Sequence, residues 1–69
     1  MQEIIRFKTF CIEQYKTEHD MKGAEVLCLF KRYGVLDYIA SFFDVLHTFG
    51  GKYLVQDIDL FIQARQPQT

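Results

Sequence analysis

The sequence lacks the features from which the function of a small protein is most often predicted. Its 8 basic and 9 acidic side chains leave a formal net charge of −1, so it has no surplus of the positive charge with which nucleic-acid-binding proteins contact phosphate. No apolar run reaches the roughly 20 residues of a membrane-spanning helix, and no signal peptide or internal repeat is visible. No catalytic or cofactor-binding motif stands out. We therefore expect a cytoplasmic protein that binds no cofactor, metal or small-molecule substrate and is not an enzyme.

Cysteine is scarce, and the two residues present form no recognisable site. Cys11 and Cys28 belong to no CxxC pair and to no Cys/His cluster with the spacing of zinc ligands. Each lies in an apolar helical pattern, which predicts two small buried side chains in a reducing compartment. A disulfide between Cys11 and Cys28 on neighbouring helices remains open as the alternative.

Apolar surface is what the chain has in abundance. Hydrophobic residues make up 49% of its 69 residues and aromatic residues 16%, whereas a chain this short forms one domain with a small interior. Such a core supplies only about 3–5 kcal/mol. We therefore expect part of the apolar surface to contact a protein partner or a second copy of the chain.

The apolar periodicity predicts an all-α fold, a small single-domain bundle over residues 1–65 with a frayed polar tail at 66–69. The predicted helices cover residues 1–18, 23–33, 35–47 and 55–65. Gly34 alone separates the second from the third, so it should adopt the left-handed conformation that ends many helices and make a sharp corner. Residues 48–52 predict a loop, and residues 53–55 have a strand-like composition without an obvious strand to pair with.

The apolar positions of these helices predict the core. They are Ile4, Ile5, Phe7, Cys11, Ile12 and Tyr15 in the first helix, Val26, Leu27, Phe30 and Tyr33 in the second, Val35, Leu36, Ile39, Phe42, Phe43 and Leu46 in the third, and Leu54, Val55, Ile58, Phe61 and Ile62 around the last. We expect the third helix to form the centre of this core. Asp57 and Asp59 fall in the first turn of the last predicted helix, where free N–H groups stabilise carboxylates.

His47 is the polar residue whose role is most open. In one interpretation His47, Thr48 and Tyr53 form a site, and Asp44 orients the imidazole for acid–base chemistry. In the other, His47 ends a helix and binds its last carbonyl groups. We favour the second, since no nucleophile stands at a readable spacing and 69 residues leave little room for a deep pocket. We likewise expect His19, at the end of the first helix, to bind the last carbonyl groups of that helix.

Two functions of different kinds stay open. The main hypothesis is a protein-interaction module whose surface comprises Leu29, Tyr38, His47, Phe49, Tyr53 and Leu60. The alternative is a DNA-binding regulator, because the two helices around Gly34 resemble a helix-turn-helix. Lys31 and Arg32 would then contact DNA, although apolar residues occupy most of the start of the next helix, where polar base-reading side chains are needed.

Several strings resemble a family of short bacterial proteins along nearly the whole chain. The most specific are Tyr-Gly-Val-Leu-Asp-Tyr at residues 33–38 and Leu-His-Thr at residues 46–48. The family is the one catalogued as domain of unknown function 3791. It has no established activity, so the resemblance implies no catalytic residue. Its members are similar to accessory proteins encoded beside ADP-ribosyltransferase-like toxins, which implies an antitoxin or partner-binding role.

Overall fold

The chain folds as an assembly of helices, which confirms the predicted all-α class. The computed structural model describes residues 2–66, and these contain no strand. The helices are α1 (Gln2–His19), α2 (Gly23–Tyr33), α3 (Val35–Ser41), α4 (Phe43–Leu46) and α5 (Gly51–Arg65). Of the predicted tail, only Gln66 lies among the described residues. None of the described helices is both long and apolar enough to cross a membrane.

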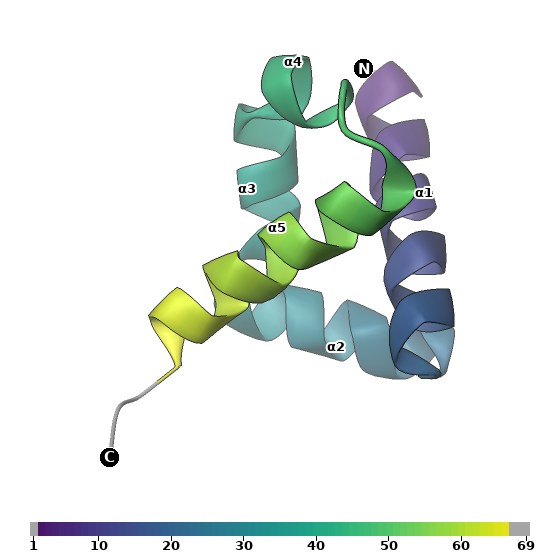
Figure 1. Cartoon of the computed structure of the whole chain (residues 1–69), viewed down its shortest axis with the longest axis vertical. Helices are drawn as coiled ribbons and strands as arrows, with labels where there is room; N and C mark the ends of the chain where they lie inside the picture. The colour runs from purple at the N-terminus through teal and green to yellow at the C-terminus, as the bar shows by residue number, and fades with distance from the viewer. Residues whose placement is uncertain (1, 67–69) are drawn as a thin grey trace.

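The first three helices form a frame that α5 crosses. In Figure 1, α1 and α3 form two upright sides, α2 joins them at the base, and α5 runs diagonally in front of all three. The longest-range packing in the molecule is that of α5 against α1. The apolar side of α5 therefore fills the inside of the frame, and its other side faces solvent.

The two corners of the frame depend on residues in the left-handed conformation. Asp20 ends α1 with φ 51°, and the N–H of Met21 donates back to the carbonyl of Lys16 at 3.0 Å. Aspartate is one of the few residues with a side chain that adopts this conformation readily. Gly34 makes the second corner, with φ 71° and ψ 26°, and its N–H donates to the carbonyl of Phe30. Since α3 begins at the next residue, the predicted sharp corner is present.

The core lies where α5 crosses the frame, and it draws on every helix. Its buried side chains are Cys11, Tyr15, Val26, Phe30, Val35, Ile39, Leu46, Leu54, Val55, Ile58 and Ile62. All of them lie on the apolar positions that the periodicity predicts. Phe30 contributes the largest of the fully buried side chains, and its ring meets that of Tyr15 edge-on, with centroids 5.2 Å apart.

The predicted helix over residues 35–47 is not continuous, because it breaks at Phe42. This residue has φ −115° and ψ 25°, outside the α-helical region. The break turns α4 so that Phe43 packs edge-on against Phe7 of α1, with ring centroids 5.4 Å apart. It also leaves Phe42, predicted to be in the core, 52% exposed.

The last helix begins earlier than predicted, and the strand-like composition of residues 53–55 has no counterpart in the structure. Helix α5 starts at Gly51 because Leu54 and Ile58, one turn apart, both reach the core. Gly51 also permits a close approach to α1. A Cβ atom at this position would clash with the side-chain oxygen of Gln14, so any larger residue would displace that side chain.

Besides Phe42, two further residues predicted to be buried are exposed, and helical geometry explains both. Ile5 is 62% exposed and Cys28 is exposed. Each lies two positions from a residue that packs inward, Phe7 and Val26 respectively, and two positions correspond to about 200° around a helix. Both cysteines are free thiols, and burial raises the pKa of the Cys11 thiol to about 12.

Substituting Gly34 tests the corner between α2 and α3. We expect Gly34→Ala to lower the free energy of unfolding by about 1–2 kcal/mol, because an L-residue is strained in the left-handed conformation, although a Cβ atom would meet nothing within 4 Å. Urea denaturation measures the change. The control is Gly23→Ala, in the first turn of α2, where the added methyl makes only ordinary contact with Lys16 and should be neutral or stabilising. Equal losses in the two variants would contradict a conformational role for Gly34.

Candidate functional site

Two carboxylates project from opposite sides of α5, and each accepts hydrogen bonds from a neighbouring helix. Asp57 and Asp59 were predicted to lie in the first turn of the last helix. That prediction is wrong, since α5 begins at Gly51 and both residues fall in its middle. They are two positions apart and therefore point to opposite flanks, with Ile58 between them in the core.

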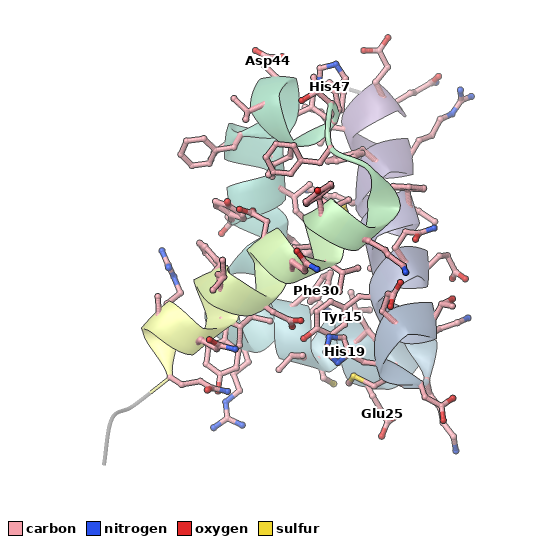
Figure 2. All side chains as sticks on the ribbon, in the orientation of Figure 1. Tyr15, His19, Glu25, Phe30, Asp44 and His47 are labelled. Atoms are coloured by element: carbon pink, nitrogen blue, oxygen red, sulfur yellow. The ribbon has the colours of Figure 1, made fainter. Side chains whose placement is uncertain are left out.

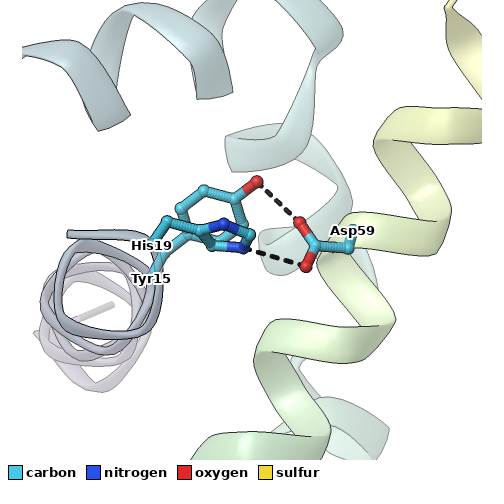
Figure 3. Close-up of polar contacts among 3 residues, drawn as sticks. All are labelled: Tyr15, His19 and Asp59. Carbon is cyan, nitrogen blue, oxygen red and sulfur yellow. Dashed lines mark hydrogen bonds and ion pairs between the residues drawn. The ribbon is translucent and has the colours of Figure 1, made fainter. Parts of the chain in front are cut away.

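On the flank facing α1, Asp59 binds two side chains (Figure 3). The hydroxyl of Tyr15 donates to Oδ1 of Asp59 at 2.6 Å, and Nε2 of His19 lies 2.9 Å from Oδ2. The rings of Tyr15 and His19 stack with centroids 4.2 Å apart. Burial, followed by the hydrogen bond and the negative charge of Asp59, raises the pKa of Tyr15. The hydroxyl therefore stays a donor at neutral pH.

The group formed by Tyr15, His19 and Asp59 links α1 to α5 through side-chain hydrogen bonds. Both oxygens of Asp59 are occupied by side chains of α1, so the three residues link the two helices. His19 was predicted to bind the terminal carbonyls of its helix, but its Nε2 binds Asp59 of α5 instead. The signal in the sequence is the four-residue spacing of Tyr15 and His19, which places them on one face of α1.

On the other flank, Asp57 fastens α5 to α3. The hydroxyl of Tyr38 donates to Oδ2 of Asp57 at 2.6 Å. Burial, with the hydrogen bond and charge of Asp57, raises the pKa of Tyr38 to about 12, against the opposing effect of Arg65. The Tyr38 ring stacks on Phe61 at 4.1 Å, and the guanidinium of Arg65 lies 3.6 Å from the centre of the Phe61 ring.

An open apolar groove lies beside the Tyr38–Asp57 hydrogen bond, along the solvent-facing side of α5. Its volume is about 620 Å³. We call it the α5 groove; it is lined by Thr48, Phe49, Gly50, Tyr53, Gln56, Asp57 and Leu60. Tyr53 is 72% and Leu60 65% exposed. Asp57 is the only charged side chain in this lining.

The predicted interaction residues separate into those at the groove and those elsewhere. Phe49, Tyr53 and Leu60 line it together, and Tyr38 borders it through Asp57. Leu29 packs half-buried against the core. The sequence did not single out Gln56 or assign Asp57 to this surface. Their signal is the recurrence of positions 53, 56, 57 and 60 on one helical face, which requires a helix that starts before residue 55.

His47 does not line the groove, although the next residue, Thr48, does; it lies at the end of α4 and near the N-terminal end of α1 (Figure 2). Its Nδ1 lies 2.8 Å from the carbonyl oxygen of Phe43, and its ring stacks on that of Phe43. Because a carbonyl only accepts, Nδ1 carries the hydrogen. This is the geometry of a helix-terminal histidine. No hydrogen bond within residues 2–66 joins it to Asp44 or Tyr53.

The residues of the DNA-binding hypothesis lie at the corner of α2 and α3. Lys31 and Arg32 are exposed near the end of α2. Val35 is fully buried at the start of α3, and the exposed side chain there is Asp37. A carboxylate at this position repels phosphate.

The family resemblance is confirmed by comparison with known proteins. A family model described as "Protein of unknown function (DUF3791)" matches residues 6–65, which include all the residues of the α5 groove. No curated protein matches the chain, and no solved structure does.

Removing the hydroxyl of Tyr15 tests the fastening of α5 to α1. We expect Tyr15→Phe to lower the free energy of unfolding by about 1 kcal/mol, because Asp59 loses a donor while the aromatic ring is kept. Urea denaturation measures this. Tyr53→Phe is the matched control, since Tyr53 is 72% exposed, and it should leave stability unchanged. Equal stability of Tyr15→Phe and wild type would show that the bond to Asp59 contributes nothing.

Proposed function

We propose that this chain, which belongs to the DUF3791 family, is a non-enzymatic module that binds another protein through the α5 groove. The observation that carries the proposal is the exposure of Tyr53 and Leu60 beside Phe49 in one apolar hollow. Contiguous apolar surface of this kind typically marks an interaction site in a small domain. Tyrosine is also among the residues that contribute most to binding energy at protein interfaces.

The fold supports this use of the groove because it holds α5, which carries four of the lining residues, in place. Helix α5 is packed against the frame through its core face and bonded on both flanks, by Tyr15 to Asp59 and by Tyr38 to Asp57. A surface that is already ordered before binding loses less conformational entropy on association. The partner class that the family resemblance implies is an ADP-ribosyltransferase-like toxin, which the module would neutralise.

The proposal is tested by capture of the products of the neighbouring genes, co-expressed with the tagged protein. We expect Leu60→Glu to weaken capture at least about tenfold, because a partner would have to bury the new charge in the groove. The matched control is Val45→Glu on α4, where the valine is 56% exposed and lies outside the groove. This variant should bind like wild type.

Three results would count against the proposal. In the first, light scattering shows a monomer and no partner is captured. In the second, a partner is captured equally well by wild type and by Leu60→Glu. The third applies to the toxin assignment alone: a captured partner whose ADP-ribosyltransferase activity the module does not inhibit would remove the antitoxin role and keep the binding role.

A further inference from the structure

The negative charge of Asp57 in the α5 groove indicates which kind of partner the groove binds. The inference drawn from it rests on the proposed function. Asp57 lies between Tyr53 and Leu60 on one face of α5, since the three are spaced by four and three residues. Within residues 2–66 its carboxylate accepts one side-chain hydrogen bond, from Tyr38 to Oδ2. The other oxygen is left for a ligand or for water.

No basic side chain lines the groove to balance this charge. Lys52 belongs to a separate hollow on the α1 side of α5, together with His19 and Asp59. Arg65 lies over the ring of Phe61. A purely apolar partner would bury the Asp57 carboxylate without a positive charge to balance it, which is unfavourable. The partner must therefore bring a positive charge to this position.

The same charge argues against a second copy of the chain. A two-fold symmetric dimer brings the same patch of both copies together. If two α5 helices paired through this face, its centre at Gln56 and Asp57 would lie near the symmetry axis, and each Asp57 would face its equivalent. Like charges that meet in an interface repel each other, which disfavours such a dimer.

The spacing of the lining residues along α5 favours a helix as the occupant. Positions 53 to 60 follow two turns of α5, a length of about 10 Å. A second helix laid beside α5 presents side chains at matching intervals of three and four residues. We infer that the α5 groove binds an amphipathic helix of a different protein, whose apolar side chains contact Phe49, Tyr53 and Leu60 and whose central Lys or Arg pairs with Asp57.

The test is selection from a displayed library of helical peptides about 16 residues long. Apolar residues are fixed three and four positions on either side of a fully randomised central position. The library is selected against wild type, Asp57→Asn and Asp57→Lys. Asp57→Asn removes the charge and keeps an oxygen that can accept from Tyr38, so it covers the case in which Asp57→Lys fails to fold. Asp44→Asn on α4 is the matched control for loss of one acidic charge.

We expect Lys or Arg at the central position of peptides selected by wild type and by Asp44→Asn, no such preference with Asp57→Asn, and Glu or Asp with Asp57→Lys. A selected basic peptide should bind wild type about tenfold more tightly than Asp57→Asn.

Other outcomes separate this inference from the proposed function. Peptides whose binding is lost in Leu60→Glu, but whose central residue is the same for wild type and Asp57→Asn, would overturn the charge pairing and leave the groove as a binding site. A wild-type dimer that Leu60→Glu dissociates would show that a second copy occupies the groove. A failure to select any peptide that depends on Leu60 would overturn both proposals.

Discussion

The structure depends on the packing of α5 across the frame of α1, α2 and α3. Leu54, Ile58 and Ile62 of α5 complete the core that the buried side chains of the three frame helices begin. Two tyrosine–carboxylate bonds then fix how α5 is turned about its axis. Tyr15 holds Asp59 on one flank and Tyr38 holds Asp57 on the other. These constraints decide which face of α5 is left exposed.

The proposed binding site lies on that exposed face of α5. Tyr53, Asp57 and Leu60 lie on it because the core face and both flanks of α5 are occupied. Asp57 has two roles in this account: one oxygen fastens α5 to α3, and the other meets the partner. Since the same carboxylate orients the helix and carries the charge, the proposed binding would depend directly on the fold.

Apolar periodicity was enough to predict α1, α2 and all of the buried core residues, because these depend on spacing along one helix, and Gly34 was enough to predict the corner. It did not predict the break at Phe42, which arises where Phe43 turns toward Phe7 of α1. Nor did it predict the start of α5 at Gly51, since the strand-like residues 53–55 are overridden by packing on the frame. That error placed Asp57 and Asp59 at a helix end and hid their tyrosine partners, which are 19 and 44 residues distant in the chain.

The central claim, that tyrosine–carboxylate bonds hold α5, is tested most directly by the unfolding free energy at alkaline pH. Folding raises the pKa of Tyr15 and Tyr38 above 10, that of Tyr38 to about 12, so their contribution is complete below pH 10 and is lost as pH rises through the folded pKa values. The difference in stability between wild type and the Tyr15→Phe/Tyr38→Phe variant should therefore be constant from neutral pH to pH 10 and diminish toward pH 12. A difference that is zero, or that does not change with pH, would contradict the account.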